Sequence, residues 1–220
     1  EFRRVLFRSN DTPTTLQTTP RQRLNSDERQ REIVAAVLAL ACERGPEAIT
    51  TQAIADRIGV TQGAIFRHFP DKAAIWMAVF AWVRESLGTV LATAIAKPGS
   101  PLAKIEAAFF AHVAFIAANP GVPRILFHEL QYPGDSPVRA EVRTMISGYR
   151  ERLASLFAGA RSAGEFPADL DPGLAPVLFI GAIQGLVIES AIAGSEAGMV
   201  ARARQMFPLL VDGYRGRDER

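Results

Sequence analysis

The sequence predicts an all-α protein, with an N-terminal three-helix helix-turn-helix domain followed by a larger helical domain. Three observations support this fold class. The apolar residues are rich in Ala and Leu, which favour helix by intrinsic propensity. Apolar residues recur at spacings of three and four along most of the 220 residues. No stretch of useful length alternates as a strand would, and no internal repeat is found.

The beginning of the chain is expected to lie outside the fold. Residues 1–9, EFRRVLFRS, read as the in-frame translation of a common short-read sequencing adapter, so we interpret them as an assembly artefact. A genuine basic arm or a vector-derived tag is the alternative. Without them, the 25 basic and 23 acidic residues become 22 of each, and the net charge indicates no partner. Residues 10–25 are rich in Thr, Gln and Pro, which predicts a flexible arm.

Composition places the chain among ordinary globular proteins, with 48% hydrophobic and 22% charged residues. The longest uninterrupted apolar run, residues 73–83, is shorter than the roughly 18 residues of a membrane span, so we expect no transmembrane helix and no membrane partner. The single cysteine, Cys42, excludes an internal disulfide and is consistent with a cytoplasmic protein. Its place on the apolar stripe of the first helix predicts a small core residue.

Helix signals divide the N-terminal domain, residues 26–74, into three helices. Ser26 is a plausible N-cap for the first, which Gly45 and Pro46 end. The second begins at Thr50 or Thr51 and ends at Gly59, and the third covers residues 62–69. A long helix follows residues 70–72. The remaining helices of the C-terminal domain, residues 75–215, are predicted at 102–118, 123–131, 137–163, 172–194 and 196–214.

The segment 50–72, TTQAIADRIGVTQGAIFRHFPDK, has the physical pattern of two short helices joined by a tight turn. Ala55 is small where the helices approach, Gly59 permits the turn, and Val60 fills the corner. The shared core is predicted to contain Ile54, Ile58, Ile65 and Phe69. Burial of these residues directs the start of the third helix outward, with Thr61 as its N-cap. The residues that then face outward are Thr61, Gln62, Gly63, Ala64 and Arg67. Any helical protein can contain such a corner, so the corner alone is a weak indication of DNA binding.

The whole spacing is more specific and resembles the N-terminal domain of the tetracycline-repressor (TetR) family of bacterial transcriptional regulators. The resemblance rests on a first helix ending near Gly45, the helix AIADRIGV, and the run TQGAIFRHFPDK leading into an apolar helix. It covers about residues 27–80 strongly and the helical remainder loosely. It implies that the third helix reads the major groove of DNA, and that a homodimer places two such helices about one duplex turn apart.

Carried over residue by residue, the resemblance implies that Thr51, His68 and Lys72 hold phosphates. It places Thr61, Gln62, Gly63 and Ala64 against bases and backbone. Gln62 is the best candidate for reading a base, since its amide can bond adenine N6 and N7 together. Where the family usually has a tyrosine whose hydroxyl meets a phosphate, this chain has Phe66, which leaves only an apolar contact. Arg67 contacts a phosphate or a guanine, or is a solvated cation.

The C-terminal domain carries bulky apolar residues on several helices, with a few polar side chains among them. That composition suits a mostly apolar ligand cavity, and the resemblance implies an effector pocket in this region. The pocket is predicted to include Phe109, His112, Phe115, Phe127, His128, Met145 and Gln184. A packed core is the alternative, and for any single phenylalanine it is the better one. No histidine has metal-ligand spacing, so we expect neither a metal nor a cofactor.

Small residues four apart, Gly181 and Gly185, indicate a close approach between helices near the end of the chain. The resemblance implies dimerisation through the two C-terminal helices as a four-helix bundle. The predicted interface comprises Leu178, Gly181, Gly185, Ile188, Phe207 and Leu210. Packing of these two helices within one chain is the alternative.

These features predict a DNA-binding transcriptional regulator, a homodimeric repressor that a small apolar effector releases from a palindromic operator. An enzyme is disfavoured, since no nucleophile elbow, phosphate-binding glycine loop or metal-ligand cluster is found. Two alternatives stay open. One is a DNA-binding architectural or activator protein of the same fold without a ligand, and the other is a helical adaptor that binds only protein.

Overall fold

The computed structural model describes residues 25–132, 134–195 and 198–216, and every regular element within these ranges is helical, which confirms the predicted fold class. The predictions for residues 1–9 and for nearly all of 10–25 lie outside the described residues. In chain order the elements are α1 (Ser26–Arg44), the short 3-10 helix η1 (Pro46–Ala48), α2 (Thr51–Ile58), α3 (Gln62–Phe66), α4 (Lys72–Ile95), α5 (Pro101–Ala118), α6 (Gly121–Gln131), α7 (Pro137–Ser162), α8 (Ala175–Ala193) and α9 (Met199–Arg215).

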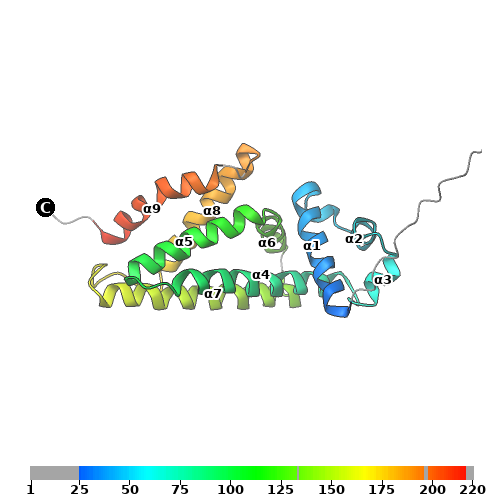
Figure 1. The fold of residues 1–220 in the computed structure, drawn as a ribbon, viewed down its shortest axis with the longest axis horizontal. Helices are drawn as coiled ribbons and strands as arrows, with labels where there is room; N and C mark the ends of the chain where they lie inside the picture. Colours follow the sequence, from blue (N-terminus) through cyan, green and yellow to red (C-terminus); the bar gives the residue numbers. More distant parts are fainter. Residues whose placement is uncertain (1–24, 133, 196–197, 217–220) are drawn as a thin grey trace, which may run out of the picture.

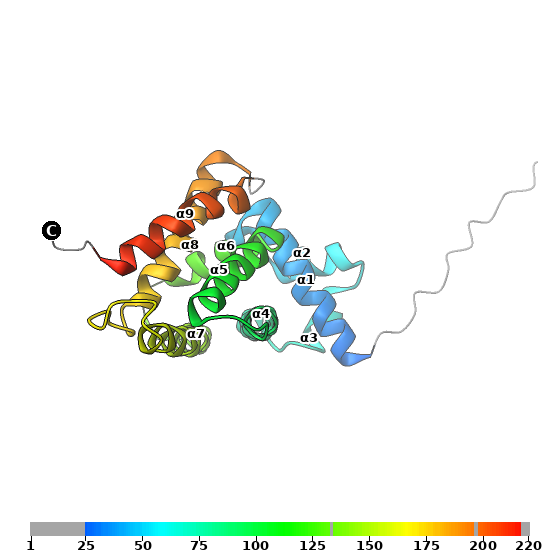
Figure 2. The same ribbon diagram turned by 60° about the vertical axis from the view of Figure 1, so that its left-hand side comes forward.

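The arrangement is elongated, with the long helices α4 and α7 lying side by side along it (Figure 1). Helices α1, α2 and α3 gather at one end, and α8 and α9 lie toward the other (Figure 1). Figure 2 looks nearly along α4 and α7 and shows α5 packed over them. The helix-turn-helix segment is therefore at the opposite end of the molecule from α9.

The first helix begins one residue earlier than predicted, because Asn25 rather than Ser26 is its N-cap. The Asn25 side chain accepts a hydrogen bond from the Glu28 backbone at 2.8 Å, and the Glu28 carboxylate accepts one from the Asn25 backbone at 2.9 Å. This reciprocal capping box needs a carboxylate three residues after the cap. A cap at Ser26 would put Arg29 there, which has no acceptor, so the position of Glu28 decides the start.

The third helix is shorter than predicted and ends at Phe66 instead of Phe69. The carbonyl of Ile65 still accepts from the backbones of His68, at 2.9 Å, and Phe69, at 3.0 Å, so one more turn follows the helix. Pro70 disfavours helical backbone at the residue before it, which limits the extension. The extra turn brings Phe69 into the core beside Ile65.

The N-terminal core continues without a break into the larger domain. The buried side chains Ile33, Val37, Ile54 and Ile65 from α1 to α3 belong to one cluster. The cluster extends to later elements through Ile75, Val79 and Phe80 of α4, Ile125 of α6, and Val138 and Val142 of α7. The unit α1–α3 therefore shares one apolar core with α4, α6 and α7, and α1 packs directly against α4 and α6. The domain boundary between residues 74 and 75 stays a prediction.

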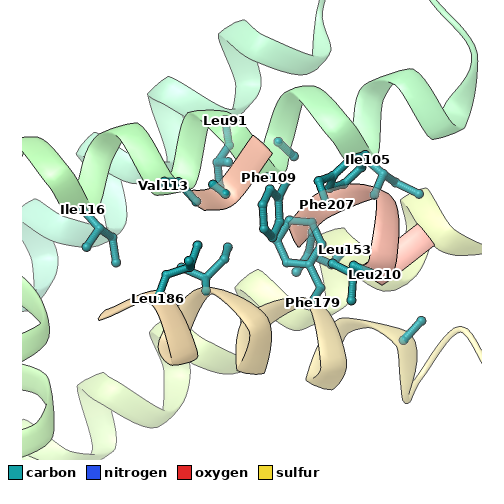
Figure 3. Packing of buried hydrophobic residues seen from close by; sticks show 14 of the residues in the cluster. Leu91, Ile105, Phe109, Val113, Ile116, Leu153, Phe179, Leu186, Phe207 and Leu210 are labelled. Carbon is teal, nitrogen blue, oxygen red and sulfur yellow. The ribbon is translucent and has the colours of Figure 1, made fainter. Parts of the chain in front are cut away.

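A second core holds α5, α8 and α9 together at the other end. Phe109 of α5 is fully buried at its centre, with ring centroids 5.3 Å from Phe179 and 5.1 Å from Phe207 (Figure 3). Phe179 meets it edge to face, a favourable geometry for aromatic pairs. The Tyr214 hydroxyl donates to the carbonyl of Ala175 at 2.8 Å, which ties α9 to the start of α8.

Three of the helices are long and apolar enough, by length and composition alone, to cross a membrane: α4, α5 and α8. The sequence analysis counted only uninterrupted apolar runs and therefore did not identify these helices as candidates, and the absence of a transmembrane helix stays a prediction. A few scattered polar residues interrupt a run but hardly lower an average over 18 residues. In the described fold each of these helices packs against other helices of the chain.

Candidate nucleic-acid interface and internal cavity

The turn between α2 and α3 is built by local hydrogen bonds. Thr50 caps α2 by accepting from the Ala53 backbone at 3.0 Å, and Thr61 caps α3 by accepting from Ala64 at 3.3 Å. Between them Gly59 adopts the left-handed conformation, with φ of 64°, which residues other than glycine seldom adopt. The Val60 backbone donates to the carbonyl of Ala55 at 3.0 Å and closes the corner.

Most of the residues predicted to meet DNA are exposed in α3 and at its two ends. Thr61, Gln62 and Gly63 are exposed, as is Arg67, and Ala64 is half-buried. Ile65 faces the opposite way and is completely buried. Phe66 exposes 46% of its surface, which is a large share for a phenylalanine. An apolar ring in water is available for contact with another apolar group, such as a thymine methyl.

Gln62 is held against the neighbouring helix. Its amide Nε2 donates to the hydroxyl Oγ1 of Thr51 at a distance of 2.6 Å. Thr51 is half-buried at the start of α2. The predicted base reader and a predicted phosphate ligand are thus joined by one hydrogen bond, which orients the Gln62 side chain before any contact with DNA.

The other two predicted phosphate ligands lie at the turn between α3 and α4. His68 is half-buried, and its Nδ1 lies 3.4 Å from the hydroxyl of Ser26 at the start of α1. Lys72 is the first residue of α4, after the N-cap Asp71, and its Nζ lies 5.5 Å from the ring centroid of Trp76. Partial burial lowers the pKa of Lys72 from its ordinary value of 10.5. These contacts hold both side chains at the turn between α3 and α4.

A separate internal cavity of about 100 Å³ lies between α4, α5, α6, α7 and α8. Its lining is almost entirely apolar and includes Phe80, Phe115 and Ile180. Three polar side chains also line it: His112 of α5, Tyr149 of α7 and Gln184 of α8. An apolar chamber with a few convergent polar groups is the usual form of a small-molecule site.

His112 and Tyr149 form a buried pair across the cavity wall. His112 Nδ1 and the Tyr149 hydroxyl are 2.8 Å apart, and the two rings meet edge to face with centroids 5.2 Å apart. Burial lowers the pKa of His112 from 6.5 to about 4, so the imidazole is neutral at pH 7. Burial also raises the pKa of Tyr149 above its ordinary value, which keeps the hydroxyl protonated.

The structure brings four of the seven predicted pocket residues to this cavity: His112, Phe115, Met145 and Gln184. Phe109 is instead at the centre of the second core, where α8 and α9 cover it. Phe127 faces a shallower hollow near Ile188, and His128 packs edge to face on Tyr132. Sequence reasoning missed Tyr149. The available signal was a tyrosine on the inner side of an amphipathic helix. Its hydrogen-bond partner, His112, lies 37 residues away in the sequence, so local spacing does not reveal the pair.

The predicted dimer residues divide into two groups. Leu178 and Ile188 of α8 are 50% and 53% exposed, and Gly181 and Gly185 lie exposed between them. Phe207 and Leu210 of α9 are only 6% and 7% exposed, because they pack inward against the second core. They are therefore not available to a partner. The most exposed large apolar side chain of α9 is Leu209 instead.

The chain matches two models of one protein family in the order in which they occur. A model described as bacterial regulatory proteins of the tetR family matches residues 33–79, which run from α1 into α4. A model described as the tetracyclin repressor-like C-terminal domain matches residues 98–188, which include α5, α6 and α7 and most of α8. The two matches together cover more than half of the chain.

Similar individual proteins include a nucleoid occlusion factor and two regulators of fatty acid degradation or transcription, by their names. Nucleoid occlusion factor SlmA from Actinobacillus pleuropneumoniae is 28% identical over 131 residues, which are 59% of this chain and 64%, less than two thirds, of that protein. The fatty acid degradation regulator FadR from Bacillus halodurans superposes with a TM-score of 0.75 at 20% identity, over 86% of this chain and 97% of that one. FadR from Bacillus subtilis, in complex with stearoyl-CoA, gives 0.71 at 22% identity, over 83% and 98%.

At these identities the solved structures show that the fold is shared. The family itself is assigned from the two sequence matches, one to the helix-turn-helix domain and one to the C-terminal domain. The chain belongs to the TetR family of bacterial regulatory proteins and has the N-terminal helix-turn-helix and the C-terminal domain of that family.

Proposed function

We propose that this protein is a cytoplasmic homodimeric repressor that binds a palindromic operator and is released by a small, mostly apolar effector. The observation that carries the proposal is the internal cavity, because helix α6 both lines it and packs against α1 of the helix-turn-helix unit. A ligand in the cavity can change the affinity for DNA only if the helix it contacts also contacts the DNA-binding unit, as α6 does through α1.

On the DNA side, the outward face of α3 enters the major groove. Gln62 exchanges its bond to Thr51 for adenine N6 and N7, and the freed Thr51 hydroxyl turns to a phosphate. His68 and Lys72 hold the backbone on the other side, and Phe66 and Arg67 extend the contact. Phosphate contacts position the protein, whereas Gln62 supplies the sequence preference.

Dimerisation uses the exposed face of α8. Leu178, Gly181, Gly185 and Ile188 follow one another on this face at a spacing of three or four residues. A Cβ added to Gly181 or Gly185 would meet nothing within 4 Å in the same chain, so the two glycines leave a shallow track for another helix. A second copy of α8 crossing there by two-fold symmetry buries the apolar side chains of both chains.

The route from cavity to DNA runs through α6. Val122 and Leu126 of this helix line the cavity. At the start of α6, Gly121 is so close to α1 that a Cβ would lie 2.2 Å from the carbonyl oxygen of Leu38. Three residues on, the guanidinium of Arg124 donates to the carbonyl of Cys42 at the end of α1. A ligand that displaces α6 therefore displaces α1 and changes the separation of the two recognition helices.

Selection of bound duplexes from a random pool tests the DNA side without knowledge of the operator. The proposal predicts enrichment of an inverted repeat whose half-sites are about 10 base pairs apart, together with two chains per duplex by sedimentation. Failure to enrich any sequence would instead favour an adaptor that binds only protein. Enrichment of a single half-site with one chain per duplex would contradict the homodimer.

A further inference from the structure

The internal cavity holds a polar atom that the apolar effector of the proposed function does not explain. Gln184 Oε1 is buried and has no hydrogen-bond partner in the part of the chain that the structure describes. Gln184 lines the cavity from α8, with His112 and Tyr149 among the other lining residues. Buried side-chain oxygens are nearly always paired, because an unpaired one has lost its hydration without gaining a hydrogen bond.

The cavity around this oxygen is electrically neutral. None of the side chains that line it in the described structure is Asp, Glu, Lys or Arg. His112 is neutral because burial lowers its pKa to about 4, and Tyr149 keeps its proton. A charged ligand group would therefore lose its hydration without gaining a counter-charge, which is costly in an apolar interior.

The size of the cavity limits the ligand as well. A cavity of about 100 Å³ compares with the roughly 150 Å³ of an engineered apolar cavity that admits benzene. Phe115 and Ile180 supply apolar walls on two different helices. This smaller space limits the ligand to at most one small ring or a short branched chain.

We propose that the effector is a neutral, ring-sized molecule that donates one O–H or N–H hydrogen bond to Gln184 Oε1 and buries an otherwise apolar body. This inference rests on the proposed function and specifies its ligand. Gln184 is then the residue that determines specificity, because a ligand without a donor leaves its oxygen unpaired. The phenol p-cresol has these properties, since its hydroxyl is protonated at neutral pH and the rest of the molecule is apolar.

Three probes of matched size test the inference on the whole chain by calorimetric titration: p-cresol, p-xylene without a donor, and the anion p-toluate. The wild-type protein is expected to bind p-cresol about tenfold more tightly than p-xylene, and p-toluate not detectably. Gln184→Leu and Gln184→Met remove the oxygen at similar volume and should bring p-cresol and p-xylene within about twofold of each other. Gln205→Leu, the same change at an exposed position of α9, should keep the tenfold preference.

The outcomes separate this inference from the proposed function. Equal binding of p-cresol and p-xylene by the wild-type chain, or a preference that survives in both folded Gln184 variants, overturns the donor requirement but leaves a ligand site. Tighter binding of p-toluate overturns the neutrality of the ligand. No heat from any probe overturns the inference but not the proposed function, because the operator selection and a screen of other apolar effectors test the latter independently.

Discussion

Phe66 stands where the resemblance places a phosphate-binding tyrosine, and it exposes nearly half of its surface beside the candidate DNA residues. Phe66→Tyr adds a hydroxyl at the outer edge of the ring without disturbing the core. We expect affinity for every duplex to rise by about 0.5–1.5 kcal/mol, the value of one hydrogen bond, with no change in sequence preference. Fluorescence anisotropy on selected and scrambled duplexes measures this; a gain on one duplex alone would argue against a phosphate contact.

His112 makes the free energy of unfolding depend on pH. Because burial lowers its pKa from 6.5 to about 4, the unfolded chain binds a proton between these values that the folded protein does not bind. The stability that His112 contributes is full above pH 6.5 and decreases as the pH falls toward 4. Between about pH 7.5 and about pH 5 the loss is roughly 2 kcal/mol.

His112→Gln removes this dependence while keeping a side chain that can hydrogen-bond with the Tyr149 hydroxyl. Urea unfolding of both proteins at the two pH values gives the difference directly, because the carboxylates contribute equally to each. The variant should lose about 2 kcal/mol less than the wild type on acidification. The same loss in both proteins would show that His112 is not the titrating group.

The contact between α1 and α6 depends on one glycine. At Gly121 an added Cβ would overlap the Leu38 carbonyl at 2.2 Å, and the atom met is backbone, which cannot turn aside as a side chain can. We expect Gly121→Ala to lower the free energy of unfolding by about 1–3 kcal/mol. The matched control is Gly148→Ala in the interior of α7, where a Cβ meets nothing within 4 Å and the gain in helix propensity is up to about 1 kcal/mol.

The urea unfolding midpoints of the Gly121→Ala and Gly148→Ala variants test whether α6 is packed tightly against α1. Opposite shifts agree with a tight α1–α6 contact, whereas equal shifts would mean that α6 is not pressed against α1. Because the same contact is the proposed route from cavity to DNA, a folded Gly121→Ala protein should also bind operator with altered affinity, and the Gly148→Ala protein should not.

Most helices could be predicted from the sequence, because apolar spacing and Gly or Pro breaks are local signals. The exceptions have local causes too: Glu28 selects Asn25 as the cap, and Pro70 shortens α3. The cavity was only partly predictable. Apolar character alone does not separate Phe115, which lines the cavity, from Phe109, which lies in the second core, because helix packing decides which side of α5 faces an empty space.

At the scale of the whole molecule, the proposed two-fold dimer is the feature that operator binding is expected to depend on. Ile188 of α8 is half exposed in the single chain and lies on the proposed dimer face. Ile188→Arg places a charge in that face and should raise the dimer dissociation constant by roughly a hundredfold, since an unpaired buried charge costs about 3 kcal/mol or more. The fold of each chain should persist, because Ile188 is half exposed and belongs to neither core cluster.

Sedimentation equilibrium measures the dimer, with Leu130→Arg on α6 as a control of similar exposure outside the face. The control should dimerise like the wild type. An Ile188→Arg protein that remains dimeric would place the interface elsewhere on the molecule. The paired loss of dimer and of operator binding would connect the assembly to the reading of an inverted repeat.

The central claim is that α3 reads DNA sequence through Gln62 while Lys72 at the start of α4 holds the backbone. Titration of Gln62→Ala and Lys72→Ala on the selected and a scrambled duplex, at two salt concentrations, tests it most directly. Gln62→Ala should lose about 1–3 kcal/mol on the selected duplex only, whereas Lys72→Ala should weaken both duplexes about equally and reduce the salt dependence by about one charge. Equal losses in the two variants on both duplexes would contradict the claim.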